Sequence, residues 1–267
     1  MVSGTERIAA AFAAAPGRAA LMPYMMGGFP DVRTSIEIGL ACADAGADLM
    51  ELGVPFSDPL ADGPVIHAAG TRALAAGATL HGVLDIAARL SDRVAVVLMC
   101  YTNLVLARGV QRFADELAAT GAGGLIVPDL PLEEADPVRA ACDAAGLALV
   151  PLVAPTTPED RLAAIAGGAR GFVYTVSVTG TTGERAGVDG SLAALLARTK
   201  AHSPVPVAVG FGISTPEQAA GAADAGADGV IVGSRLVRAA TEAVDAGADP
   251  AVAVGDLVAA LAAGLRR

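Results

Sequence analysis

Two carboxylates that could exchange protons follow one another closely in "ELGVPFSDPLADGP", residues 51 to 64. Glu51 stands inside an apolar run with the pattern of a β-strand, and Asp62 follows in the loop that leaves this strand. An ionised carboxylate among apolar side chains is costly unless it is paired, so burial raises its pKa toward neutrality. The pattern favours a general acid/base role for Glu51. A structural glutamate paired with an arginine elsewhere in the chain is the alternative.

The loop after this strand leaves two interpretations open for each of its aspartates. Asp62 lies in "LADGP", where an ordinary Asp-Gly turn would explain it, but its closeness to Glu51 favours a second catalytic carboxylate. Asp58 is followed by Pro59, so turn chemistry or a place in an interface explains it without catalysis. His67 has no second histidine nearby, and the sequence therefore predicts no metal site.

Glycine-rich turns late in the chain suggest a second task, the binding of a phosphate group. "VGFGIS" at 209–214 and "IVGSR" at 231–235 each end an apolar strand and lead into a helix. Small residues let backbone N–H groups approach an anion, and a helix N-terminus favours negative charge. Two tight turns without a ligand are the alternative. Arg235 could add positive charge to such a site.

A long connection and the few tyrosines complete the candidate site. Residues 177–191, "SVTGTTGERAGVDGS", form a longer link than is usual between elements, which is typical of a lid that closes over a substrate. A plain surface loop is the alternative. Tyr24, Tyr101 and Tyr174 are the only tyrosines, and we expect all three in strands, either packed in the core or lining a pocket.

A repeated unit must hold these residues in place. Each copy has an alanine-rich segment closed by glycine and then a short apolar strand, which predicts a helix, a turn and a strand. About eight strands alternate with helices, and this favours a closed (β/α)8 barrel, whose chemistry lies at the C-terminal ends of its strands. An open dinucleotide-binding sheet is disfavoured because no G-x-G-x-x-G follows an early strand. Clear copies of the unit are "AGADLMELG" (45–53), "TGAGGLIVPD" (120–129) and "AGADGVIVG" (225–233).

Composition narrows the class of protein further. The 267 residues, 54% of them hydrophobic, suit a single domain over residues 1–267 with a short extra helix at the N-terminus. A formal charge of −10 argues against nucleic acid and anionic membrane as partners, and the apolar runs are too short to span a bilayer. We expect a cytoplasmic protein whose three cysteines are reduced and buried.

At this point the chain resembles the tryptophan synthase alpha subunit family over nearly its whole length. "ELGVPFSDPLADGP" carries most of the resemblance. It is supported by "YTNLV" (101–105), "VPDLPLEE" (127–134), "GTTGERAG" (180–187) and "GFGIS" (210–214). The resemblance implies a TIM barrel that cleaves indole-3-glycerol phosphate to indole and glyceraldehyde 3-phosphate in tryptophan biosynthesis. This carbon–carbon lyase reaction needs no metal or organic cofactor.

The same resemblance implies a role for each matching residue. Glu51 matches the acid/base that protonates indole C3, and Asp62 matches the carboxylate that faces the indole N–H. A partner is also implied, the beta subunit, which carries pyridoxal phosphate and joins the alpha subunit in an α2β2 hetero-tetramer. The remaining matches are an indole wall of Tyr24, Met99 and Ile126, a glycerol-phosphate contact at Tyr174, a lid contact at Thr182, phosphate ligands at Gly183, Gly212, Gly233 and Ser234, and partner contacts at Asp58, Pro59 and Pro131.

Two departures and two other functions remain to be weighed. Tyr24 stands where the family commonly has phenylalanine, and Val178 replaces an arginine found in some members. Indole-3-glycerol phosphate synthase shares the barrel, but its chemistry calls for a catalytic lysine, and the only lysine is Lys200, away from strand ends. A non-catalytic barrel subunit that binds and activates a partner enzyme is the other alternative. Intact Glu51 and Asp62 argue against it.

Overall fold

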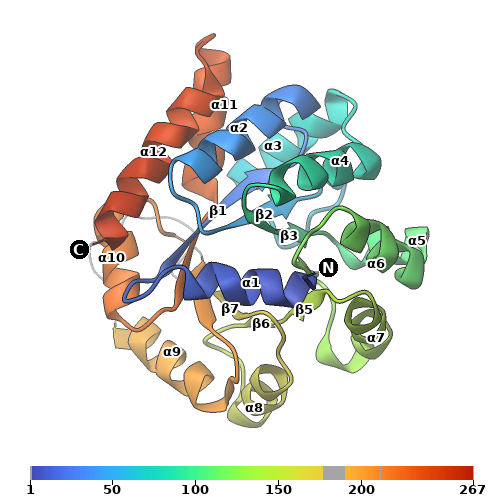
Figure 1. The fold of residues 1–267 in the computed structure, drawn as a ribbon, viewed down its shortest axis with the longest axis vertical. Coiled ribbons are helices and arrows are strands. Elements are labelled where there is room, and N and C mark those ends of the chain that lie inside the picture. Colours follow the sequence, from blue (N-terminus) through green and yellow to red (C-terminus); the bar gives the residue numbers. More distant parts are fainter. Residues whose placement is uncertain (1, 177–189, 211, 267) are drawn as a thin grey trace.

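The computed structural model describes residues 2–176, 190–210 and 212–266. Its parallel strands stand in the centre and its helices surround them (Figure 1). The strands are β1 (Ala20–Met26), β2 (Leu49–Gly53), β3 (Ala95–Met99), β4 (Gly124–Ile126), β5 (Ala148–Val150), β6 (Leu152–Val153), β7 (Val173–Val176), β8 (Val207–Gly210) and β9 (Gly229–Val232). The helices are α1 (Gly4–Ala13), α2 (Val32–Asp44), α3 (Pro64–Ala75), α4 (Leu80–Ser91), α5 (Thr102–Arg108), α6 (Val110–Ala119), η1 (Leu132–Glu134), α7 (Asp136–Ala144), α8 (Glu159–Gly167), α9 (Gly190–His202), α10 (Pro216–Asp224), α11 (Ser234–Asp245) and α12 (Pro250–Leu265).

The sheet closes on itself, which confirms the predicted (β/α)8 barrel. The described strands pair in the order β5-β4-β3-β2-β1-β9-β8-β7-β6, and every pairing is parallel. Only Pro151 separates β5 from β6, so these two short strands together occupy one position of the barrel. Proline has no N–H to donate to a ladder, but the Pro151 carbonyl accepts a hydrogen bond from Tyr174 N at 2.9 Å. The barrel therefore has eight strand positions.

The extra helix predicted at the N-terminus is present as α1, which lies across one end of the barrel in Figure 1. Ser3 and Glu6 form a capping box that starts it. Ile8, fully buried, packs with the side chains that fill the barrel interior, and Thr5 N donates to Gly146 O at 3.2 Å. This helix covers the N-terminal ends of the strands and leaves their C-terminal ends open.

Each strand directs alternate side chains into the barrel and toward the helices. Met22, Leu49, Val97 and Phe172 belong to the inner cluster, whereas neighbours such as Met50 and Leu98 pack under the helices. Because side chains alternate along a strand, Glu51 shares the inner face of β2 with Leu49. The fold therefore places a carboxylate inside the barrel.

Two copies of the repeated "AGAD" sequence use their aspartate in the same way. Asp48 Oδ2 accepts from Leu21 N and Asp228 Oδ2 accepts from Val207 N, each at 2.8 Å. The backbone N–H groups of both aspartates donate back to the same residues. Each aspartate thus extends a strand ladder at the N-terminal end of the barrel, where such residues serve stability rather than chemistry.

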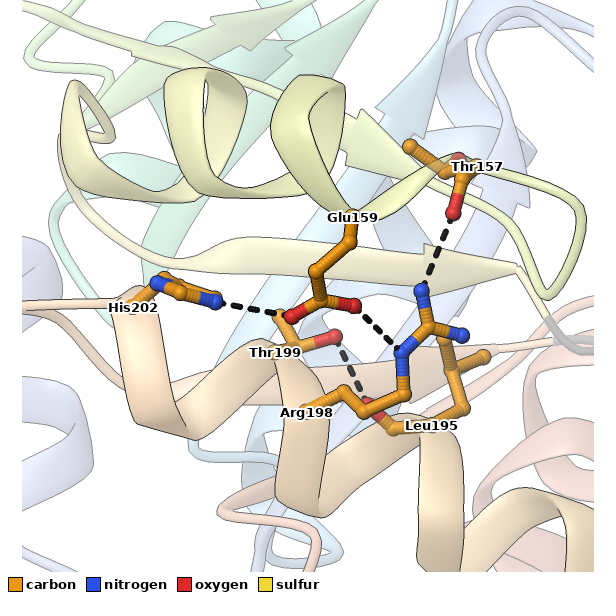
Figure 2. Close-up of polar contacts among 6 residues, drawn as sticks. All are labelled: Thr157, Glu159, Leu195, Arg198, Thr199 and His202. Carbon is orange, nitrogen blue, oxygen red and sulfur yellow. Dashed lines mark hydrogen bonds and ion pairs between the residues drawn. The ribbon is translucent and has the colours of Figure 1, made fainter.

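A polar cluster joins α9, the helix that follows residues 177–189, to α8 (Figure 2). Glu159 accepts from Arg198 Nε at 2.9 Å, and its other carboxylate oxygen lies 2.9 Å from His202 Nε2. Arg198 also donates to the Thr157 carbonyl at 3.1 Å. The C-terminal part of the helix after the predicted lid is therefore fastened to the N-terminal end of α8.

Among the described residues, no single helix is both long and apolar enough to cross a bilayer. The helices α3 and α4 meet the length and composition requirements only as a pair, and they are bent by 108° at their junction. Both helices bury apolar side chains in the core, including Ile66 and Ala73 of α3 and Val83 and Ile86 of α4.

Candidate active site

Glu51 is buried in the barrel interior, with 1% of its surface exposed. Burial, with a smaller contribution from the charge of Asp62, raises its pKa from 4.5 to about 8. Its Oε2 has no hydrogen-bond partner among the described residues, and no arginine of that part of the chain is paired with it. The arginine-paired alternative therefore finds no support there. A carboxyl group in this setting holds its proton at neutral pH and can deliver it.

Asp62 lies in the loop between β2 and α3, and Tyr101 holds it. The Tyr101 hydroxyl donates to Asp62 Oδ1 at 3.0 Å and accepts from Ala61 N at 3.0 Å. Burial raises the pKa of Asp62, whereas the hydrogen bond from Tyr101 and the nearby His67 lower it. The two carboxylates are thus tuned by different surroundings, which lets one act as an acid and the other as an anion.

Tyr101 was expected in a strand, either in the core or lining a pocket; the strand is wrong, and its contact with Asp62 was not predicted. It follows the end of β3 and is the N-cap residue of α5. Its ring stacks on Phe56, with centroids 5.3 Å apart, which fixes the direction of the hydroxyl. The available signal was its place after the end of a strand, inside the conspicuous "YTNLV" segment.

The register of the strands orders the predicted indole wall. Tyr24 on β1 pairs with Glu51 on β2. Two residues nearer to the C-terminal end of β2, Gly53 pairs with Met99 on β3, and Met99 pairs with Ile126 on β4. Met99 and Ile126 therefore form a layer of apolar side chains above the carboxylate. Gly53 adds no side chain to this layer, and the Tyr24 hydroxyl fills the space. A methyl group on Gly53 would lie 2.1 Å from that oxygen.

A cavity of about 480 Å³ opens at the C-terminal ends of the strands. Met99 and Tyr174 line it from inside the barrel, and Ala61, next to Asp62, lines it from the loop after β2. It continues outward along η1, α7 and α8, with Leu132, Arg139 and Ile165 among its walls. Most of its lining is apolar, which suits an aromatic ligand. Among the described residues, Tyr24, Ile126, Gly212, Gly233 and Ser234 do not line it.

Three of the predicted phosphate ligands, Gly212, Gly233 and Ser234, lie after the last two strands of the barrel. Gly212 follows β8 with a φ of 81°, a conformation that favours glycine. Gly233 caps α11 without a side-chain hydrogen bond, and Ser234 is the first residue of this helix. The N-terminus of α11 therefore presents backbone N–H groups at the position where barrels commonly bind phosphate.

Two contacts tie this end of the site to the rest. A methyl group on Gly233 would lie 3.5 Å from Tyr24 Cβ, so the turn before α11 sits beside the strand that pairs with β2. A methyl group on Gly210 would lie 2.3 Å from the Tyr174 hydroxyl, which therefore reaches the end of β8. Both tyrosines are buried in their strands, as expected. The glycine turns and the carboxylates thus share one end of the barrel.

The remaining predicted residues are at the surface or beyond the described chain. Asp58 and Pro131 are exposed and Pro59 is half-buried, so these residues can meet a partner. Leu60, which the sequence reasoning did not single out, is 90% exposed in the same loop. The predictions for Val178, Thr182 and Gly183 fall within residues 177–189 and lie outside the described residues.

The described residues hold no group of three or more His, Cys, Asp or Glu side chains suited to a metal ion. The three cysteines are free and buried, as predicted. Burial raises the pKa of the Cys42 and Cys142 thiols to about 12. These thiols stay protonated at neutral pH and pack as small apolar groups.

Comparisons with known proteins agree with this geometry. Residues 11–263 match the family model described as tryptophan synthase alpha chain. The chain is 52% identical to the tryptophan synthase alpha chain of Prochlorococcus marinus over 228 residues, which cover 84% of this chain and 82% of that protein. It is also 52% identical to that of Gloeobacter violaceus over 236 residues, covering 87% and 86%.

Solved structures give the same result in three dimensions. A structure of Mycobacterium tuberculosis tryptophan synthase superposes with a TM-score of 0.89 at 41% identity, covering 98% of both chains. The alpha subunit of Legionella pneumophila tryptophan synthase superposes with a TM-score of 0.88 at 35% identity, covering 100% of this chain and 99% of that one. With a family model spanning most of its length and relatives that are 52% identical over more than four fifths of it, the chain belongs to the tryptophan synthase alpha chain family.

Proposed function

We propose that this chain cleaves indole-3-glycerol phosphate to indole and glyceraldehyde 3-phosphate. Membership of the family supports this reaction, and the site offers the two functions that it requires. Glu51 donates a proton to indole C3, which turns the ring into a cation. Asp62 accepts a hydrogen bond from the indole N–H and stabilises that positive charge.

The second half of the reaction returns the proton. Ionised Glu51 removes the proton from the glycerol hydroxyl next to the ring as the carbon–carbon bond breaks. The bonding electron pair returns to the ring and gives neutral indole, while the hydroxyl carbon becomes the aldehyde of glyceraldehyde 3-phosphate. One proton enters and one leaves, so no external acid, base or redox partner is consumed.

One observation carries this proposal above the others. Glu51 combines complete burial, a pKa of about 8 and an oxygen without a partner among the described residues. A residue with a purely structural role would be expected to have its buried charge paired. The apolar cavity beside Met99 and Tyr174 and the glycine turns at Gly212 and Gly233 support a substrate with an aromatic end and a phosphate end.

Indole release from indole-3-glycerol phosphate tests the assignment. We expect Glu51→Gln to lower kcat by about 10²- to 10⁴-fold, the usual contribution of a general acid, while the substrate still binds. Asp62→Asn removes the anion and should cost about 10²-fold. Glu242→Gln, an exposed position on α11, is the matched control and should turn over like the wild type. Retained turnover in Glu51→Gln would refute the assignment.

The partner in this proposal is the beta subunit of tryptophan synthase, in an α2β2 hetero-tetramer. It would carry the pyridoxal phosphate of the complex, and this chain would need no cofactor of its own. The exposed loop around Asp58 and Leu60 and the segment around Pro131 would face the partner. Sedimentation of mixed subunits should show a weaker complex for Asp58→Ala than for the wild type. We place the assembly in the cytoplasm, where buried thiols stay reduced.

The same experiments separate catalysis from the alternative of a non-catalytic activating subunit. A purely activating subunit would still stimulate the beta subunit when Glu51 is replaced by glutamine, and it would release no indole with either residue present. Indole release by the wild type that is lost in Glu51→Gln, together with intact complex formation, supports the lyase.

A further inference from the structure

The buried carboxyl of Glu51 lacks a hydrogen-bond donor at Oε2 among the described residues. While the group is protonated, this costs little. Once it has given up its proton, it is an anion inside an apolar barrel, and such an anion needs a donor. Any nearby hydroxyl that can supply one changes how readily the proton moves.

The hydroxyl groups around Glu51 differ in whether they are already engaged. Tyr101 donates to Asp62 at 3.0 Å, and Thr175 donates to the Ala208 carbonyl. Tyr174 belongs to β7, four places from β2 in the order of the strands, and its hydroxyl reaches Gly210 at the end of β8. Tyr24 makes no hydrogen bond to another described residue through its hydroxyl, so none of these residues competes for its proton.

Tyr24 is also the hydroxyl residue on a strand next to β2. It pairs with Glu51 in the register of β1 and β2, so their side chains leave the same face of neighbouring strands. Its hydroxyl oxygen lies beside Gly53, 2.1 Å from the position that a methyl group on Gly53 would take. That point is one layer above Glu51 on the same strand.

The surroundings keep this hydroxyl protonated. Burial, and then the charges of Asp62 and Glu51, raise the pKa of Tyr24 well above its ordinary value of 10. Tyr24 is 7% exposed, so solvent does not compete strongly for its O–H. It can act as a neutral donor throughout the pH range in which Glu51 titrates.

We propose that the Tyr24 hydroxyl donates a hydrogen bond to Oε2 of ionised Glu51 and is a positioning residue for its proton transfer. The contact requires rotation of the Glu51 side chain toward Gly53, which has no side chain of its own and lies beside the Tyr24 hydroxyl. The hydrogen bond stabilises the carboxylate that remains after the proton has left. The consequence for catalysis rests on the proposed function, but the contact itself does not.

Direct titration of Glu51 tests the contact without any substrate. Side-chain ¹³C-labelled glutamate gives one carboxyl resonance per residue, and the resonance missing from Glu51→Gln belongs to Glu51. Tyr24→Phe removes one oxygen atom and keeps the ring. We expect the titration midpoint of Glu51 to rise by about one pH unit in this variant, because a donor to the charged form is lost.

Tyr101→Phe is the matched comparison, since it removes a hydroxyl from the same site that is bonded to Asp62 instead. The midpoint of Glu51 should stay at its wild-type value in this variant. An unchanged midpoint in Tyr24→Phe, or an equal rise in both variants, would overturn the proposal.

Kinetics then separate this inference from the proposed function. Glu51 must be protonated to act as an acid, so the alkaline limb of the kcat profile should move upward in Tyr24→Phe by the same amount as the titration. KM should change little. A shifted titration without lyase activity in any form of the protein would leave the contact standing and remove the proposed function. Normal lyase activity of the wild type with an unshifted Glu51 titration in Tyr24→Phe would leave the proposed function standing and remove the contact.

Discussion

The buried acid should impose a pH-dependent cost on folding that Glu51→Gln removes. The native pKa of Glu51 is about 8, whereas its ordinary value of 4.5 applies when the chain is unfolded. Between these values the folded protein holds a proton that the unfolded chain has lost, so raising the pH favours unfolding. The full difference corresponds to about 5 kcal/mol, of which about 3 kcal/mol is reached at pH 7.

Glutamine has nearly the same shape and no charge to bury. The stability of Glu51→Gln minus that of the wild type should therefore be small at pH 5. It should grow by about 1.4 kcal/mol per pH unit and level off above pH 8. The difference between the two proteins cancels the contributions of all other titrating groups.

Urea denaturation at intervals from pH 5 to pH 9 measures this difference, provided that the m-value stays the same in both proteins. Glu242→Gln, exposed on α11, should track the wild type at every pH. A stability difference between Glu51→Gln and the wild type that does not change with pH would show that Glu51 is ionised in the folded protein. The acid role assigned to it would then be wrong.

Three further substitutions test other parts of the structure. Tyr101→Phe removes the hydrogen bond that lowers the pKa of Asp62, so indole release should fall about tenfold and the acidic limb of its pH profile should move upward. Gly53→Ala places a methyl group 2.1 Å from the Tyr24 hydroxyl and should lower the free energy of unfolding by about 1–3 kcal/mol in urea. Asp48→Ala leaves a buried strand N–H without its acceptor and also breaks the ion pair of Asp48 with Arg18, so it should cost about 1–3 kcal/mol in the same assay without changing KM.

Matched controls distinguish these effects from general damage. Gly82 lies within α4, and a helix favours alanine over glycine. In Gly82→Ala the added methyl group would lie 3.4 Å from Val32, an ordinary contact distance. This variant should be as stable as the wild type or more so, and a loss equal to that of Gly53→Ala would contradict the steric argument. Asp44→Ala breaks an exposed ion pair with Arg93 and should cost less than about 1 kcal/mol. If Asp48→Ala lowers the free energy of unfolding no more than Asp44→Ala does, the hydrogen bond from Leu21 N to Asp48 adds nothing to stability.

Much of the fold was readable because the pattern repeats. Each alanine-rich segment that ends in glycine before an apolar run did become a helix, a turn and a strand, as at 45–53 and 225–233. Regular alternation of helix and strand leaves few ways to bury both faces of a parallel sheet. What the pattern could not show is that the fifth barrel strand is divided at Pro151, because the break depends on which neighbours pair on either side.

The candidate site was predictable where a residue contradicted its surroundings. Glu51 stood out because a carboxylate in an apolar strand has few purely structural explanations, and Gly233 stood out because it lies between a strand and a helix. Tyr101 did not stand out, since a tyrosine near the end of a strand also fits ordinary packing. Its role depends on a loop 39 residues earlier in the chain bringing Asp62 within 3.0 Å of its hydroxyl.

The sequence by itself determined the periodicity of the elements, the apolar setting of Glu51 and the small residues at the ends of the last strands, because these are local properties of neighbouring residues. Only the tertiary structure decided the layer in which each side chain lies, the raised pKa of Glu51 and the closeness of Tyr24 to it. Those properties arise from strand register and from the exclusion of water, and both exist only once segments distant in the chain have packed together.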